Sequence, residues 1–339
     1  SASAASSLEY DAFRVVNVIK SFHAKVASVT YCNDEDDPST FYVFIGSADG
    51  LVQKYKIISS ADGNIVTQAL VRSKLGRKRI DALQAVGELD MLFALCDGTL
   101  HVLSAESLSR NDAAPALKGV STFCMNQKGP PLYRLAVALR RRLTLFELPS
   151  FTARKTLDVG APPAAIAWYG EHLMVAHQHG GYAVVNESSG DVTDMAAEMR
   201  ASNPVIKIMP GDLVLVAAND TLGLFLDFRG HPARRNPVEW ANSPTAVALC
   251  EPFTLALVDG GSRIQIHDVG VDTATARAIQ TIDAKSLDNA TQVAVLTDAL
   301  FLTDQQIQQS GARDAYRRGA PQAASGAGIA SAGAASTPT

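Results

Sequence analysis

A recurring pattern of short apolar runs constrains the fold of this chain more than any other feature. Seven such runs, each of β-strand length and bounded by turn residues, begin about 40 to 55 residues apart. They lie at 26–31, 80–86, 119–124, 164–169, 205–210, 245–250 and 291–296. Most are followed by a hairpin that turns at Asp-Gly, Gly-Gly or other small polar residues, which tolerate positive φ angles. Repeats of this period are typical of propeller blades.

We therefore expect an all-β fold, a seven-bladed β-propeller. The last unit fades after residues 299–309 and shows no outer strand, whereas the run at 13–19 precedes the first unit and has no blade of its own. We expect this N-terminal strand to complete the seventh blade, which would close the ring and leave no unpaired sheet edge. Residues 193–201 are the best candidate for a short helix.

Both ends of the chain are rich in small residues that bury too little apolar surface to offset the entropy of ordering. We expect residues 1–10 to be disordered, residues 11–312 to form the propeller and residues 313–339 to form a low-complexity, disordered tail. None of the apolar runs in the sequence is long enough to cross a bilayer.

Three histidines, His172, His177 and His179, lie close together in an apolar segment and raise the question of a metal site. His172 falls in a turn and His177 at the far end of the next strand, which separates them by about 16 Å. Zinc ligands lie about 2 Å from one shared ion, so these two histidines cannot share one. The four cysteines form no CxxC pair. We expect no metal, no cofactor and no disulfide framework.

Sequence signatures of the common enzyme classes are missing. The chain has no P-loop, no GxSxG nucleophile turn and no HExxH helix, so we name no catalytic residue and expect a protein that is not an enzyme. A propeller enzyme is the alternative, and it would need catalytic groups that converge on the central channel. A net charge of -4 and only 6% aromatic residues also argue against nucleic acid as a partner.

Several blocks resemble a known family. They are "KRIDALQAVGELDMLFALCDGTLHVLSAESL" (78–108), "YRLAVALRRRLTLFEL" (133–148) and "PPAAIAWYGEHLMVAHQHGGYAVVN" (162–186). In order and content they resemble the citron homology (CNH) domain, and more narrowly the N-terminal propellers of the Vam6 / TGF-β-receptor-associated-protein group of tethering subunits. The resemblance covers roughly residues 13–310. Full-length members continue into a long α-solenoid, so we expect this chain to be an excised domain or a shortened relative.

The resemblance implies a function in membrane traffic. Such relatives are cytosolic proteins that dock on endosomal or lysosomal/vacuolar membranes within the HOPS or CORVET complexes, and their N-terminal propellers are associated with Rab GTPase recognition. It implies a non-catalytic interaction propeller that binds a Rab-family GTPase or other tethering-complex subunits during tethering and fusion. The alternative within the family is a regulatory module of a kinase or exchange-factor pathway.

Charges divide unevenly between the two expected faces of the ring. The turns after the inner strands carry ten acids and one base, Lys128. The acids are Asp34, Glu35, Asp36, Asp37, Glu88, Asp90, Glu171, Asp212, Glu251 and Asp298. These charges are expected mainly to solvate the turns.

The opposite face is expected to be basic. It receives Arg72, Lys74, Arg77, Lys78 and Arg79 from the link into the second unit, and Arg140, Arg141 and Arg142 from the hairpin of the third. We also assign Arg234 and Arg235 to this face. The first eight are our candidate contacts for an acidic protein partner, which charge would steer into place, or for anionic lipid headgroups during peripheral membrane contact.

Overall fold

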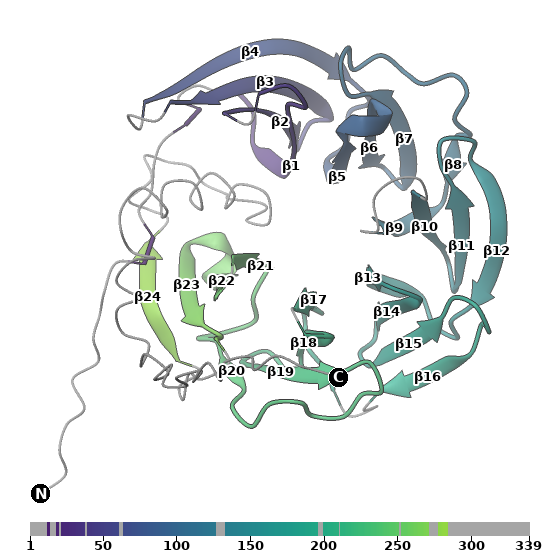
Figure 1. Ribbon diagram of the computed structural model, residues 1–339, viewed down its shortest axis with the longest axis vertical. Coiled ribbons are helices and arrows are strands. Elements are labelled where there is room, and N and C mark those ends of the chain that lie inside the picture. The colour runs from purple at the N-terminus through teal and green to yellow at the C-terminus, as the bar shows by residue number, and fades with distance from the viewer. Residues whose placement is uncertain are drawn as a thin grey trace, which may run out of the picture.

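Six four-stranded antiparallel sheets surround a central axis in the computed structural model (Figure 1). The structure describes residues 12–13, 18–19, 22–37, 39–60, 64–126, 133–195, 199–209, 211–250, 252–270 and 277–283. Each sheet is a meander whose four strands pair in chain order. The first strand of each sheet lies nearest the axis, and the fourth lies on the outside of the ring (Figure 1).

The strands of the first three sheets cover residues 26–158. The first sheet contains β1 (Val26–Asn33), β2 (Thr40–Ser47), β3 (Leu51–Ser59) and β4 (Ile65–Lys74). The second contains β5 (Ile80–Val86), β6 (Met91–Cys96), β7 (Thr99–Ser104) and β8 (Leu117–Lys118). The third contains β9 (Val120–Met125), β10 (Arg134–Leu139), β11 (Arg142–Glu147) and β12 (Thr152–Asp158).

The strands of the other three sheets cover residues 163–283. The fourth sheet contains β13 (Pro163–Tyr169), β14 (His172–His177), β15 (Tyr182–Asn186) and β16 (Val192–Met195). The fifth contains β17 (Ile206–Met209), β18 (Leu213–Ala217), β19 (Leu222–Asp227) and β20 (Val238–Glu239). The sixth contains β21 (Ala246–Cys250), β22 (Phe253–Val258), β23 (Arg263–Asp268) and β24 (Ala278–Asp283). Two short 3-10 helices are Gly87–Leu89 and Asp259–Gly261.

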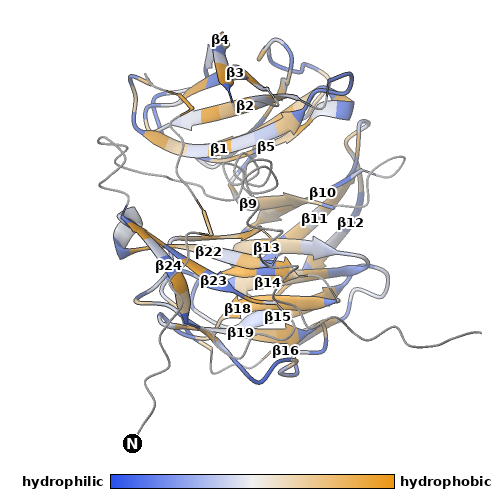
Figure 2. Ribbon diagram, turned by 60° about the vertical axis from the view of Figure 1, so that its left-hand side comes forward, coloured by the Kyte–Doolittle hydropathy of each residue, from blue (hydrophilic) through white to orange (hydrophobic). Residues whose placement is uncertain are grey.

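The core lies between neighbouring sheets rather than at the centre of the ring. Second strands are buried on both faces, which explains their continuous apolar sequences: all six residues of β6 and of β22 are buried. Outer strands such as β12 are mostly exposed and carry charged residues. Hydrophobic colouring accordingly covers much of β10, β11, β18 and β19 (Figure 2). Asp97 and Gly98, with φ of 50° and 64°, form the tight turn from β6 to β7.

The prediction of seven blades is wrong, because the described residues form six. Six of the seven predicted first strands are confirmed as β1, β5, β9, β13, β17 and β21. The seventh, at 291–296, and the run at 299–309 lie outside the described residues. Each observed sheet takes four strands from one repeat, whereas the last unit offers two apolar runs before the polar stretch at 303–310. The sequence of the last unit therefore differs from the other six in offering fewer apolar runs.

The N-terminal segment contacts the first and the sixth sheets. The Phe13 N–H donates to Gln280 Oε1 (2.9 Å), Gln280 Nε2 donates to the Phe13 carbonyl (2.8 Å), and the Phe13 ring meets Phe253 edge-on at 5.4 Å. Thr67 of β4 donates its hydroxyl to the Val18 carbonyl (2.7 Å). Residues 14–17 lie outside the described part, and no described seventh sheet receives this segment.

Two further expectations concern the local structure. The helix predicted over 193–201 is wrong in its first part, because residues 192–195 form β16, the outer strand of the fourth sheet. Residues 196–198 lie outside the described part of the chain. The predicted disordered ends, 1–10 and 313–339, also lie outside it.

Candidate partner-binding site

One face of the ring carries the two predicted basic clusters, which we call the basic face: Arg72, Lys74, Arg77, Lys78, Arg79, Arg140, Arg141 and Arg142. Antiparallel meanders place the hairpins between second and third strands at the same end as the links between sheets. The first cluster occupies the end of β4 and the link to β5, and the second occupies the hairpin between β10 and β11. All eight side chains are exposed.

The first cluster is only partly paired. Lys74 Nζ lies 2.6 Å from Asp49 Oδ2, and Arg79 Nε lies 3.7 Å from Asp81 Oδ1. Among the described residues, no carboxylate lies within ion-pair distance of Arg72, Arg77 or Lys78. Exposed pairs contribute at most about 1 kcal/mol, so they orient side chains without removing the positive field. The cluster remains available to an acidic partner.

The second cluster sits on a tight turn. Arg140 adopts a left-handed conformation with φ of 55°, which projects the two-residue hairpin beyond the sheet. Arg141 Nε lies 3.4 Å from Asp158 Oδ2 on β12. Arg140 and Arg142 have no ion-pair partner within the described ranges. Between the two clusters along the ring lies the β6–β7 hairpin, which contributes Asp97 and no base.

The opposite face carries acids that organise their own turns. Tyr42 Oη donates to Asp34 Oδ2 (2.8 Å), and the Ser39 and Thr40 hydroxyls donate to Asp37 (2.6 and 2.7 Å). These hydrogen bonds hold the pKa of both carboxyls below the usual range. Glu251 and Asp298, and the base Lys128, lie outside the described residues. The carboxylates of Asp34 and Asp37 thus accept hydrogen bonds from residues of their own hairpin.

Arg234 and Arg235 were assigned to the wrong face. They lie in the connection from β19 to β20, which emerges on the acidic side of the ring. Arg234 also serves the fold, because its Nη1 donates to the Val269 carbonyl and its guanidinium lies 4.5 Å from the Phe225 ring centre. The error arose because the sequence did not reveal the short strand β20, which reverses the chain once more before the sixth sheet.

The inner strands of all six sheets line a central cavity of about 1260 Å³. Its lining includes Cys32 of β1, whose pKa is raised to about 11 mainly by burial, so the thiol stays protonated at neutral pH and is a poor nucleophile. The described residues contain no group of three or more His, Cys, Asp or Glu placed to hold a metal ion.

The two histidines are separated along one strand, as the sequence analysis expected, although His172 begins the strand rather than lying in the turn. His172 and His177 occupy opposite ends of β14. The His172 ring stacks on Phe228 with centroids 5.5 Å apart. Trp168 and Trp240 are 2% and 4% exposed, so both are core residues.

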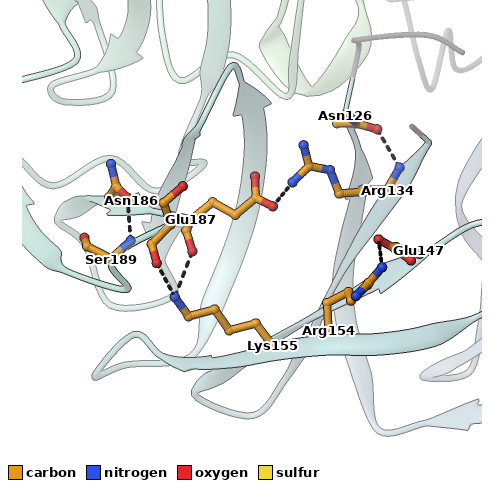
Figure 3. A network of polar contacts seen from close by, with 9 residues as sticks. Asn126, Arg134, Glu147, Arg154, Lys155, Asn186, Glu187 and Ser189 are labelled. Atoms are coloured by element: carbon orange, nitrogen blue, oxygen red, sulfur yellow. Dashed lines mark hydrogen bonds and ion pairs between the residues drawn. The ribbon is translucent and has the colours of Figure 1, made fainter. Parts of the chain in front are cut away.

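One polar element was not foreseen. Arg134 of β10 pairs with Glu187, in the turn after β15, across the boundary between the third and fourth sheets (Figure 3). Asn126 Oδ1 accepts from the Arg134 N–H (2.6 Å), and Lys155 Nζ donates to the Glu187 and Ser188 carbonyls (2.9 and 2.8 Å). No motif marks these residues in the sequence. Only the packing of neighbouring sheets brings them together.

In the part of the chain that the structure describes, no helix has the length and apolarity needed to cross a membrane.

A family comparison assigns the propeller. Residues 43–291 match the family model described as "CNH domain". The chain belongs to the CNH domain family. This confirms the resemblance drawn from the repeat blocks. The propeller also superposes on a solved structure titled "AfRom2 CNH domain" with a TM-score of 0.54 at 15% identity, covering 76% of this chain and 84% of that one.

Curated relatives of this CNH domain are much longer proteins. "Transforming growth factor-beta receptor-associated protein 1 homolog" of Danio rerio is 26% identical over 234 residues, covering 65% of this chain and 27% of the relative. "Vacuolar morphogenesis protein 6" of Schizosaccharomyces pombe is 19% identical over 243 residues, covering 63% and 26%. The chain thus spans about a quarter of each relative's length. Both groups named by the resemblance are among the relatives.

Proposed function

We propose that this CNH propeller is the partner-recognition module of an endolysosomal tethering subunit of the HOPS/CORVET kind. In this proposal the basic face binds a Rab-family GTPase or another subunit of the tethering complex. The relatives named for TGF-β receptor association and vacuolar morphogenesis support the cellular setting. The protein would then act in the cytoplasm and reach endosomal or lysosomal/vacuolar membranes peripherally.

The observation that carries the proposal is the set of exposed cations without carboxylate partners on one face: Arg72, Arg77, Lys78, Arg140 and Arg142. Unpaired charges raise the association rate of an oppositely charged partner. The first sheet packs on the second, and the second on the third, through buried apolar clusters, so little conformational entropy is lost when a partner docks. An exposed set of cations on a packed scaffold is suited to binding an acidic partner.

A pull-down from a panel of endosomal Rab GTPases tests the proposal, with each GTPase loaded with GDP or a GTP analogue. We use the variant Arg140→Glu/Arg142→Glu, because neither side chain has an ion pair to lose within the described residues. The matched control is Arg229→Glu/Arg235→Glu, two exposed arginines on the opposite face.

Capture of one Rab in its GTP state, lost in the first variant and kept in the control, supports the proposal. Capture that survives both variants rejects the basic face as the site. Absence of capture in either nucleotide state rejects the Rab assignment. Vesicles containing phosphatidylserine provide a separate arm, because each Lys or Arg near an anionic surface contributes about 1 kcal/mol. Vesicle binding without Rab binding would identify a lipid-binding face instead.

A further inference from the structure

β4 is an outer edge strand with an unusual amount of exposed apolar surface. It is ten residues long, and no other described strand is longer. Val66 is 57% exposed and Leu70 is 44% exposed. These are two of only four large apolar side chains exposed within the described residues, and they share one face of the strand because side chains alternate. The outer strand of the first sheet therefore exposes an apolar surface at the periphery of the ring.

The backbone of β4 offers unpaired groups along its outer edge. The Ser60 N–H donates to the Asn64 carbonyl, and the Ser59 N–H donates to the Ser39 carbonyl on the side of β2. Because antiparallel pairs alternate between bonded and non-bonded positions, the peptide groups of Thr67 and Ala69 point away from β3. No other described residue forms a backbone hydrogen bond with these groups.

The other outer strands are very short, charged at the centre or paired with the N-terminal segment. Within the described residues, β4 has only a β-bulge and one side-chain contact with the N-terminal segment, in which the Thr67 hydroxyl donates to the Val18 carbonyl (2.7 Å). β8 and β20 have two residues each, β12 carries Arg154 and Lys155 at its centre, and β16 carries Asp194. β24 lacks central charges, but the N-terminal segment lies against it through Phe13. β4 has no charge and no proline before Arg72, and its one irregularity is a register shift at Leu70 and Val71, between the pairs of Arg72 with Gln53 and Ala69 with Tyr55. Proteins normally block such edges.

Charge at the end of β4 indicates what kind of strand would fit. Arg72 and Lys74 end the strand, Arg77, Lys78 and Arg79 follow it, and the strand itself contains no acid. An added strand would thus lie against apolar side chains first and against cations beyond them. An acidic segment is complementary to this arrangement, whereas a basic one is repelled.

We propose that β4 is a docking edge for an extended, acidic segment of a partner protein, which adds to the first sheet as a fifth, antiparallel strand. Its acidic N-terminal end lies beside Arg72 and Arg77, and its alternating apolar side chains cover Val66 and Leu70. Main-chain hydrogen bonds to Thr67 and Ala69 supply affinity, and the alternate side chains supply specificity. This goes beyond the proposed function, because GTPase recognition by the basic face requires no strand addition.

Fluorescence anisotropy tests the proposal with the purified chain and a fluorescein-labelled peptide of three glutamates followed by Val-Thr-Val-Thr-Val. Ala69→Pro removes one outward N–H without touching the ladder to β3, and Ala69→Thr is its matched control, because it keeps that N–H. We expect Ala69→Pro to weaken binding about tenfold, the equivalent of one hydrogen bond of about 1.4 kcal/mol, and Ala69→Thr to leave it within about twofold. A peptide with lysines in place of the glutamates should not bind.

Equal binding by both variants, or no binding of the acidic peptide to the unmodified chain, overturns the proposal. If a thermal melt shows that Ala69→Pro is unfolded, the unmodified chain is tested instead with a peptide whose valines are N-methylated. N-methyl groups also block strand pairing, so this peptide should bind more weakly. Unchanged affinity of the N-methylated peptide then overturns the proposal. Rab capture is scored separately on Ala69→Pro, so failure of the strand-docking site and failure of the basic face give different results.

Discussion

Arg134 and Glu187 form an ion pair between the third and fourth sheets, and only 20% and 14% of their side chains are exposed (Figure 3). The Arg134 guanidinium also lies 5.6 Å from the ring centre of Trp168, the buried tryptophan of the fourth sheet. The pair therefore joins two sheets whose shared core is apolar, and it adds to the hydrogen bonds from Lys155 to the Glu187 and Ser188 carbonyls.

Glu187→Gln should destabilise the fold strongly, because it leaves the Arg134 charge largely buried without its counter-charge. We expect a loss of about 3 kcal/mol in the free energy of unfolding, measured by urea denaturation. The control is Glu147→Gln at the more exposed pair with Arg154, where the loss should stay below about 1 kcal/mol. Similar losses for the two variants would show that the Arg134 pair is no more than a surface contact.

Phe13→Ala should weaken the attachment of the N-terminal segment to the sixth sheet. Phe13 is 4% exposed and packs edge-on against Phe253, so truncation removes a buried ring and costs about 3 kcal/mol. Hydrogen exchange should accelerate in β24, with little change in β10. Val192→Ala, at a side chain 38% exposed, is the control and should alter stability by less than about 0.5 kcal/mol. Unchanged exchange in β24 would contradict the attachment.

Stability should fall as the pH drops from about 6.5 to 4. His267 is fully buried, its Nε2 lies 3.0 Å from the Glu239 carbonyl oxygen, and burial lowers its pKa to about 4. The unfolded chain binds this proton near pH 6.5 and the folded chain only near pH 4, so acid favours unfolding over that interval.

Urea denaturation at pH 7 and pH 4.5 measures the effect of His267. The change in unfolding free energy should shrink in His267→Gln. It should not vanish, because burial also lowers the pKa of His101. An identical pH dependence in the variant would exclude His267 as its source.

Gly223→Ala should be destabilising, because a Cβ at this position would lie 2.6 Å from the Trp240 ring. Overpacking of this kind costs about 1–3 kcal/mol. Gly76→Ala is a matched control, since the nearest atom to its added Cβ is Cys96 Sγ at 3.5 Å, an ordinary contact. Thermal melts of the two variants provide the comparison. A melting temperature for Gly223→Ala equal to that of Gly76→Ala would contradict the packing of Trp240 described above.

The repeat pattern allowed much of the fold to be predicted, because the second strands of the sheets are buried on both faces and therefore have continuous apolar sequences. Turn residues such as Asp97 and Gly98 located the hairpins for the same local reasons. The number of sheets was overestimated, since a run like that at 291–296 looks like a first strand whether or not three more strands follow. Counting first strands alone cannot correct this error.

The candidate site was predictable only in part. Clusters within one turn, such as Arg140 to Arg142, are placed correctly once the strands are known. Arg234 was misplaced because β20 has only two residues and gives no periodic signal. The pair of Arg134 and Glu187, and the bare edge of β4, depend on which sheets become neighbours and how long each outer strand is. A local sequence pattern predicts neither the neighbours of a sheet nor the length of its outer strand.

Recognition of a GTPase by the basic face can be measured through the association rate constant of the captured Rab at low and high salt. We expect Arg140→Glu/Arg142→Glu to slow association about tenfold at low salt and to remove most of the salt dependence, and Arg229→Glu/Arg235→Glu to change neither. Equal rate constants for the two variants, or a rate independent of salt in the unmodified chain, would contradict the claim.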